Sequence, residues 1–161
     1  EKALSTVWVD KSPDGNEVKS RLCVRGFEQD LQKDVSFFSP TPSSVSLRLA
    51  LALAHQGSYD IRCGDISAAF LIAEINERVI ARPPKEWKGP AGDVWLLLRT
   101  LFGIRLSMKD WSTRFTGVMP AANFLQSRAD PCLCSRTDDT GTTIFYLHVD
   151  DLLVDGTKGT T

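Results

Sequence analysis

Residues 144–156, IFYLHVDDLLVDG, place two adjacent carboxylates, Asp150 and Asp151, between two strongly apolar runs. Short runs rich in aliphatic and aromatic residues are typical of β-strands, so the sequence predicts a hairpin with the Asp pair at its tight turn. Two ionised carboxylates beside an apolar sheet repel each other, and loss of solvent strengthens that repulsion. A hard divalent cation such as Mg²⁺ is bound by one or two carboxylates together with substrate phosphates. We therefore interpret the turn as a candidate metal site.

A simpler interpretation stays open, because tight turns favour Asp for its tolerance of left-handed backbone. The chain provides its own comparison in a second pair, Asp138 and Asp139. That pair lies in the polar, glycine-containing segment 136–142 (RTDDTGT), which predicts a solvated hairpin loop that needs no ion. The apolar flanks of Asp150 and Asp151 distinguish the two pairs and favour a function for the pair at 150–151.

Size and composition favour a globular domain. The chain has 161 residues, of which 42% are hydrophobic and 24% are charged, which excludes a disordered or fibrous chain and predicts one domain or a large part of one. The longest apolar stretch, 47–54, is too short for a membrane span, and the first residues lack the pattern of a signal peptide. We expect a soluble, intracellular protein.

Charge and cysteine content exclude two further classes. A formal net charge of −1 is not that of a free-standing nucleic-acid-binding domain, so any polyanion must be bound locally. Cys132-x-Cys134 has no second pair or nearby histidine to complete a zinc site, and buried reduced thiols are expected instead. Two basic clusters, which are more often solvated surface than phosphate sites, comprise Lys19, Arg21 and Arg25, and Arg99, Arg105, Lys109 and Arg114.

Hydrophobic periodicity and turn signals predict an α+β order of hairpin, helix, strand, helical turn, two strands, helix and three strands. The first hairpin joins 6–10 to 18–25 through the turn signal 12–16 (SPDGN), and 29–34 and 37–42 are a polar loop and an extended connection. Ser43 or Ser44 caps a helix that ends near Gly57, and its apolar residues on most sides predict that it is well buried. The other predicted elements are strands at 59–66, 78–82, 93–101, 132–136 and 142–149, a helical turn at 67–72, and a helix at 108–119 with Trp111, Phe115 and Val118 on one face.

Asp65 ends one of these strands, and strands far apart in sequence can be neighbours in a sheet. We therefore expect Asp65 to lie near Asp150 and Asp151. Three converging carboxylates suit two divalent ions that clamp the attacking and leaving oxygens of a phosphoryl transfer.

Several short motifs follow one another along the chain. They are Arg21-x-x-Val24-x-Gly26-Phe27, Phe38-Ser39-Pro40, the leucine-rich helix, 65–71 (DISAAFL), 101–105 (LFGIR), Trp111, 130–133 (DPCL) and 148–156 (HVDDLLVDG). Their order and spacing resemble those of copia-type retrotransposon reverse transcriptases, from about Val18 onward. Each motif is weak alone, but the ordered set is specific.

The resemblance implies a right-hand polymerase fold. It implies a ferredoxin-like palm, in which an antiparallel sheet carries helices on one face, together with a fingers β-hairpin. It further implies a single partial reverse transcriptase domain over 1–161, with about 1–58 fingers-like and about 59–161 mostly palm. The chain is expected to be truncated before the thumb and RNase H segments of the family.

The resemblance also implies roles for the acidic residues. By motif position, Asp65, Asp150 and Asp151 match the family's catalytic, metal-binding carboxylates, with Mg²⁺, or Mn²⁺, as the cofactor.

Nucleotide contacts are implied in the same way. Arg21 matches the fingers arginine that meets the incoming triphosphate, a task that a guanidinium fork suits, and Lys19 either assists or is merely solvated. Phe70 matches the aromatic that blocks a ribose 2′-hydroxyl, although a core aromatic on a short helix fits its spacing equally. Gly103, Arg105 and Lys109 are expected to contact template and primer.

Two departures from the family's pattern affect these expectations. The family usually has Leu-Tyr-Gly-Leu-Lys-Gln-Ala-Pro-Arg before the tryptophan, whereas residues 106–110 here read LSMKD. Because that segment helps to hold template and nucleotide, the loss of Gln and Pro weakens the expected grip. His148 replaces a tyrosine before the Asp pair and keeps a ring with a hydrogen-bonding tip, although at acidic pH its charge would oppose a nearby metal.

The resemblance implies an RNA-directed DNA polymerase from a Pol polyprotein, which extends a primer on an RNA or DNA template with deoxynucleoside triphosphates by two-metal nucleotidyl transfer. Its expected location is cytoplasmic, in a virus-like particle, or nuclear, with no membrane partner. The alternative is a non-catalytic, decayed or truncated retroelement-derived domain. A third function, that of an unrelated metal-dependent phosphohydrolase, needs further ligands, and His55 and His148 offer few. The sequence leaves the oligomeric state and the identity of template and primer open.

Overall fold

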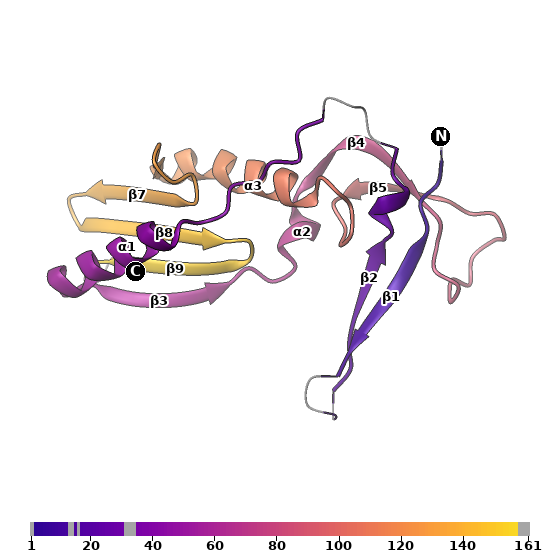
Figure 1. The fold of residues 1–161 in the computed structure, drawn as a ribbon, viewed down its shortest axis with the longest axis horizontal. Coiled ribbons are helices and arrows are strands. Elements are labelled where there is room, and N and C mark those ends of the chain that lie inside the picture. The colour runs from indigo at the N-terminus through magenta and orange to yellow at the C-terminus, as the bar shows by residue number, and fades with distance from the viewer. Residues whose placement is uncertain (1, 13–14, 16, 31–34, 158–161) are drawn as a thin grey trace. The chain divides into compact units, whose positions relative to one another are not determined.

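The structure, a computed structural model, describes residues 2–12, 15, 17–30 and 35–157. The chain divides into two compact units, each built from two separate stretches of sequence. Unit 1 contains Glu1–Phe38 and Phe70–Trp111, and unit 2 contains Ser39–Ala69 and Ser112–Thr161. Both units combine helical segments with antiparallel β-pairs, so the predicted mixed α and β composition is confirmed (Figure 1).

Helices and strands follow the predicted order closely. In chain order they are β1 (Thr6–Lys11), β2 (Lys19–Val24), η1 (Gly26–Glu28), α1 (Ser44–Gly57), β3 (Asp60–Asp65), α2 (Ala69–Ile72), β4 (Glu74–Ala81), β5 (Trp95–Arg99), α3 (Ser107–Val118), η2 (Met119–Ala122), β6 (Leu125–Gln126), β7 (Leu133–Asp138), β8 (Gly141–His148) and β9 (Asp151–Gly156). The two-residue strand β6 and the short 3-10 turns were not predicted, and β4 begins earlier than expected. Most of the turn between β1 and β2, and most of the predicted loop at 29–34, lie outside the described residues.

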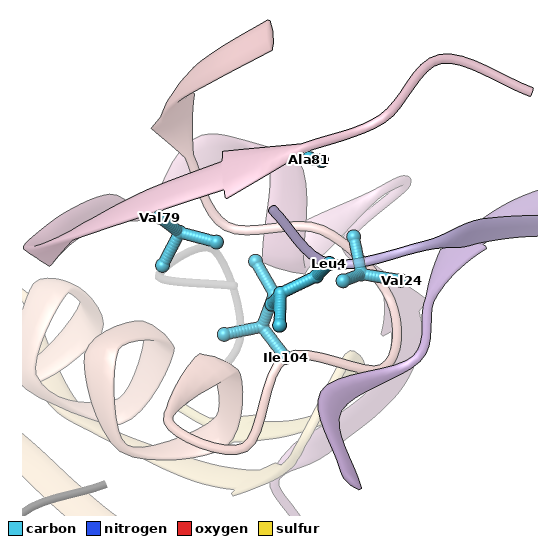
Figure 2. Close-up of a cluster of buried hydrophobic side chains, with 5 residues drawn as sticks. All are labelled: Leu4, Val24, Val79, Ala81 and Ile104. Atoms are coloured by element: carbon cyan, nitrogen blue, oxygen red, sulfur yellow. The ribbon is translucent and has the colours of Figure 1, made fainter. Parts of the chain in front are cut away.

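Unit 1 is built around two antiparallel hairpins, β1–β2 and β4–β5. The segment before β1 joins them, because the Leu4 N–H donates to the Ile80 carbonyl at 2.8 Å and the Leu4 carbonyl accepts from the Arg82 N–H at 2.7 Å. A buried apolar cluster lies where these segments meet (Figure 2). Its members are Leu4, Val24, Val79, Ala81 and Ile104.

Unit 2 contains a five-stranded antiparallel sheet in the order β3-β9-β8-β7-β6. Two of the three inner strands, β8 and β9, come from the apolar runs around the Asp pair, and the edge strand β3 pairs with β9 from a segment more than eighty residues earlier. Figure 1 shows that the end of β3 and the turn between β8 and β9 lie at the same end of this sheet. The sheet therefore brings Asp65 to the strand that carries Asp151.

Helix α1 packs against β9 and begins as predicted. The Ser43 side chain accepts a hydrogen bond from the Val45 N–H, and Ser58 ends the helix in the left-handed conformation. The prediction that α1 is well buried was wrong. Only the small side chains of Ala50 and Ala54 are buried, whereas Leu49 is 58% exposed, because the sheet covers one stripe of a helix that is apolar on most sides.

The cysteines agree in part with the expectation of buried, reduced thiols. All four thiols are free, and Cys132 and Cys134 are buried as expected, but Cys63 is exposed. Burial, with the neighbouring Asp130 carboxylate, raises the pKa of the Cys132 thiol to about 11, so this thiol stays protonated near neutral pH.

Within the described residues, no helix is long and apolar enough to cross a membrane.

Candidate functional site

Asp65 and Asp151 are direct partners across the β3–β9 ladder. Directly opposite residues of an antiparallel pair share a face of the sheet, with Cβ atoms about 4.5–5.5 Å apart. Across the β8–β9 ladder, His148 is the partner of Asp151. The sheet therefore sets Asp65, Asp151 and His148 in one row on one face, and the predicted proximity of the first two is confirmed by their register.

Asp150 occupies the turn itself. The turn residues are Val149 and Asp150, and Asp151 is the first residue of β9, so the predicted hairpin is confirmed with Asp150 at its tip. Val149 has a φ of 59°, an uncommon conformation for a β-branched residue, which marks a strained turn. The Ile66 N–H donates to the Asp150 carbonyl at 2.8 Å, which fixes this strained turn to the segment that follows Asp65.

The three carboxylates have the donor chemistry of a hard-cation site. Asp65 and Asp151 are exposed and Asp150 is half-buried, so the expected loss of solvent at the Asp pair was wrong: the apolar flanks are covered, but the turn itself is open to solvent. None of the described Lys, Arg or His side chains forms an ion pair with them. Within the described residues, no three His, Cys, Asp or Glu side chains are close enough together to hold a metal ion. Carboxylate oxygens are the ligand type that Mg²⁺ prefers, but the structure does not gather these side chains into a metal site.

The comparison pair at Asp138 behaves as predicted for a solvated loop. Asp138 accepts a hydrogen bond from the Thr140 N–H at 2.9 Å and pairs with Arg136 at 3.1 Å. Hydrogen bonds from the Thr140 side chain and N–H lower the pKa of Asp138. Its charge is thus satisfied by an ion pair and hydrogen bonds within its own hairpin, whereas Asp65 accepts a long hydrogen bond from the Ser67 hydroxyl at 3.5 Å and forms no ion pair with the described residues.

A buried polar network that sequence reasoning missed fixes the start of α1 to the sheet. Asp130 is 4% exposed and accepts from the Ser43 N–H and the Cys132 N–H, both at 3.0 Å. The Tyr146 hydroxyl on β8 donates to the Ser43 carbonyl at 2.5 Å. Burial opposes ionisation of Asp130, but hydrogen bonds from Ser46, Ser43 and Cys132 outweigh it and lower the pKa of this carboxyl. The Asp of the motif at 130–133 therefore has a structural role, which is to hold the start of α1 against the sheet.

A second acid on β9, Asp155, was also not singled out by the sequence. Its side chain is 1% exposed, and neither carboxylate oxygen has a hydrogen-bond partner among the described residues. Burial raises the pKa of Asp155. It lies four residues from Asp151 along the strand, between Ile61 and Ile144 on the neighbouring strands, so it is not part of the row at the hairpin end.

In unit 1, the structure brings Arg21 and Phe70 onto one aromatic ring. The Arg21 guanidinium lies over Phe102 at 5.3 Å from the ring centroid, and the Phe70 ring meets Phe102 edge-on at 5.6 Å. The Thr100 hydroxyl donates to the Phe70 carbonyl. The partly buried Phe70 therefore has a packing role, which leaves both interpretations of its aromatic ring open.

Basic side chains gather on the β1–β2 hairpin beside Arg21. Lys11 and Lys19 are register partners, and Val9 is the partner of Arg21. These four residues and Ser12 line a pocket of about 420 Å³. Two directly opposed lysines repel each other, so an anion at this hairpin is favoured. Lys11 joins the predicted Lys19 and Arg21 as a residue that the sequence analysis had not assigned.

The three residues predicted to contact template and primer differ in their packing, exposure and hydrogen bonds. Gly103 has a φ of 93°, and a Cβ atom there would lie 2.0 Å from the Val24 carbonyl oxygen, so glycine is required by packing. Arg105 is exposed, and the Lys109 ammonium donates to the Ser36 carbonyl at 3.0 Å. Contacts of these residues with nucleic acid remain a prediction.

The altered segment 106–110 forms the start of α3. Leu106, Ser107 and Asp110 are buried. The Ser107 hydroxyl donates to the Leu101 carbonyl at 3.0 Å, and the Asn76 side chain donates to Asp110 at 2.8 Å. These three side chains therefore serve the interior of the protein instead of presenting groups to a ligand.

Comparison with known proteins adds an independent observation. The family described as reverse transcriptase (RNA-dependent DNA polymerase) matches residues 1–161. The chain belongs to this family, in its copia-type branch. The resemblance found in the ordered motifs is thereby confirmed. No solved structure matches this reverse transcriptase chain.

Curated relatives of this reverse transcriptase chain are parts of transposon polyproteins. The chain is 31% identical to the retrovirus-related Pol polyprotein from transposon TNT 1-94 of Nicotiana tabacum, over 95% of the chain and 12% of the relative. It is 27% identical to the Pol polyprotein from transposon RE1 of Arabidopsis thaliana, over 90% of the chain and 10% of the relative. It is 33% identical to the truncated transposon Ty1-A Gag-Pol polyprotein of Saccharomyces cerevisiae, over 90% of the chain and 12% of the relative. The chain thus spans about a tenth of the length of the polyproteins it matches.

Proposed function

We propose that the chain is the fingers and palm portion of an RNA-directed DNA polymerase, with unit 2 as the palm and unit 1 as the fingers. The observation that carries the proposal is the pairing of Asp65 with Asp151, with Asp150 fixed in the adjoining turn by the Ile66 N–H. Family membership supports the same assignment. The reaction is the addition of a deoxynucleotide to a primer 3′-hydroxyl, directed by an RNA or DNA template.

In this proposal the three acidic residues bind the metal ions. Asp65 and Asp150 would hold Mg²⁺, or Mn²⁺, and Asp151 would support them from the start of β9. When bound, these ions supply the positive charge that neutralises charge developing on the phosphate oxygens during nucleotidyl transfer. The strained turn at Val149 keeps Asp150 in a fixed backbone position, so less conformational entropy is lost when the carboxylates take up their ligand.

Groups of unit 1 bind and select the nucleotide. The Arg21 guanidinium provides a fork of donors for triphosphate oxygens, and Lys11 and Lys19 add charge to the same hairpin. The Phe102 ring beneath the Arg21 guanidinium orients that group before the nucleotide binds. Phe70, braced by Phe102 and by the Thr100 hydroxyl, excludes a ribose 2′-hydroxyl.

Primer extension tests the proposal. The purified chain is expected to extend a primer on an RNA template in the presence of Mg²⁺, and Asp150→Asn is expected to abolish extension. Asp138→Asn, at the solvated Asp pair of the β7–β8 hairpin, is the matched control and should leave extension unchanged. Extension that survives Asp150→Asn would overturn the assignment of the carboxylates.

The burial of Leu106, Ser107 and Asp110 favours a second function, a non-catalytic domain derived from a retroelement. Side chains that serve the interior cannot also grip a template. Under this function the wild-type chain folds but incorporates no nucleotide with either metal ion, while template-directed incorporation by the wild type excludes it.

A further inference from the structure

Strand β5 presents an open apolar edge. It pairs with β4 on one side, and on its other side no strand from the described residues pairs with it. Side chains alternate along it: Trp95 and Leu97 are half-buried, whereas Leu96 and Leu98 are exposed by 55% and 74%, and Val94, directly before the strand, is exposed by 57%. Leu96 and Leu98 therefore lie on one face of a two-stranded sheet, and Val94 precedes them at the same spacing.

Edges of this kind are association sites. An unpaired strand edge offers main-chain N–H and carbonyl groups to another strand, and natural proteins usually block it with Lys, Pro or an inward-pointing charge. Residues 93–99 (DVWLLLR) contain no such block within the apolar run. Their only charged residues are Asp93 at the start and Arg99 at the end.

These two charges lie at equal distances from Leu96, three residues away on either side. In an antiparallel pair formed by two copies of β5 with Leu96 opposite Leu96, Asp93 of each copy faces Arg99 of the other. Val94 then faces Leu98, so apolar side chains meet across the whole centre. We propose that the β5 edge is a self-association surface, at which a second copy of this chain pairs antiparallel about a two-fold axis through Leu96.

Charge complementarity singles out a second copy as the occupant. A two-fold interface is self-complementary, and a strand whose end charges are opposite and equally spaced from its centre satisfies that condition with its own sequence. Any shift of register removes both Asp93–Arg99 pairs at once. Both end groups have capacity for a further partner. Arg99 keeps half of its side chain exposed while it pairs with Glu74 and donates to the Ile72 carbonyl, and among the described residues the Asp93 side chain accepts one hydrogen bond, from the Trp87 ring at 3.2 Å.

A charge-exchange experiment tests both the surface and the register. Sedimentation velocity of the full 161-residue chain over a range of concentrations is expected to show a monomer–dimer equilibrium. Asp93→Arg gives a chain with two positive ends, and Arg99→Asp gives a chain with two negative ends, so each alone is expected to dimerise about tenfold more weakly. An equimolar mixture of the two variants restores opposite charges at both positions and is expected to recover the dimer at wild-type strength.

Two further variants keep the proposal falsifiable if the charge variants disturb the hairpin. Leu96→Lys sets two ammonium groups opposite each other at the two-fold axis and is expected to abolish the dimer. Leu49→Lys, at a similarly exposed leucine on α1, is the matched control and should not change dimerisation. A monomeric wild type at all concentrations, a dimer indifferent to Leu96→Lys, or a variant mixture that stays monomeric would each overturn the proposal, and the melting temperature of each variant shows that it is folded.

Discussion

Asp65 and Asp151 face each other directly across the last register pair of the β3–β9 ladder. Like charges in directly opposed positions destabilise a sheet, typically by a few tenths to about 1 kcal/mol. No Lys or Arg of the described residues relieves this pair. A cation bound between these two carboxylates would offset that repulsion.

Replacing one of the two carboxylates measures the cross-strand repulsion through stability, without an activity assay. Asp65→Asn is expected to raise the free energy of unfolding by about 0.2–1 kcal/mol without Mg²⁺, because the cross-strand repulsion disappears. The same variant should lose the increase in melting temperature that Mg²⁺ gives the wild type. Thermal unfolding with and without Mg²⁺ measures both effects, and Asp138→Asn, which leaves the site untouched, should respond to Mg²⁺ like the wild type. A wild-type chain whose melting temperature is indifferent to Mg²⁺ would contradict the prediction.

Asp155 should make stability fall as pH rises. Its carboxyl is buried without a partner among the described residues, and burial raises its pKa above the usual 3.8. Between 3.8 and the higher folded value, the native state holds a proton that the unfolded chain has lost, so the free energy of unfolding decreases with pH in that window. The contribution is fully present below the unfolded value and is lost as pH passes through the folded value.

The variant Asp155→Asn removes this titration. At pH 7 it is expected to be more stable than the wild type, because it removes a buried charge while it keeps a polar side chain of the same size, and near pH 3, where the Asp155 carboxyl is protonated, the difference should be small. Urea unfolding at both pH values measures it. A difference that persists unchanged at pH 3 would show that the carboxylate charge is not the cause.

Gly103 and Gly92 form a matched pair that separates packing from backbone strain. Both have positive φ, 93° and 91°, but a Cβ atom at Gly103 would meet the Val24 carbonyl oxygen at 2.0 Å, whereas nothing lies within 4 Å at Gly92. Gly92→Ala is expected to cost about 1–2 kcal/mol from strain alone. Gly103→Ala should cost about 1–3 kcal/mol more, because the Cβ atom forces the backbone of β2 to move. Equal losses in urea unfolding would mean that the close approach to Val24 is relaxed at little cost.

The network at Asp130 should stabilise unit 2 chiefly above acidic pH. Because hydrogen bonds lower the pKa of Asp130, its contribution is present above the unfolded value of 3.8 and is lost as pH falls through the folded value. Asp130→Ala leaves the Ser43 and Cys132 N–H groups without their acceptor and is expected to cost about 1–3 kcal/mol at pH 7. Asp139→Ala, at an exposed position, is the control for unfolding measurements at pH 7, and a loss of similar size there would contradict a specific role for Asp130.

Much of the fold could be predicted from local patterns. The strands on either side of the Asp pair, the capped start of α1 and the β1–β2 hairpin follow from apolar alternation and turn chemistry. The ordered motifs identified the family because a set of spaced residues carries more information than any one of them. The register between Asp65 and Asp151 was expected only in outline, because strand pairing across more than eighty residues depends on the whole sheet.

Other features depend on tertiary context that no local pattern contains. The exposure of Leu49 on α1 and of Leu98 on β5 is set by which neighbours cover them, and periodicity alone overestimated the burial of α1. Asp130 and Asp155 have the same side chain but opposite pKa shifts, because Asp130 receives hydrogen bonds from backbone N–H groups and Asp155 receives none from the described residues. The sequence alone could not distinguish the environments of these two carboxyl groups.

The division into two units, each made of two separated stretches, has a consequence for synthesis on the ribosome. Unit 1 has all of its sequence once Trp111 has emerged, while 39–69, already made, still lack the strands that complete their sheet. Helix α1, with its exposed leucines, therefore waits for β7, β8 and β9 before Asp130 and Tyr146 can fix its start. Nascent chains that stop between Trp111 and the β8–β9 hairpin would expose this helix to chaperones, and the period of exposure lengthens as translation of residues 112–156 slows.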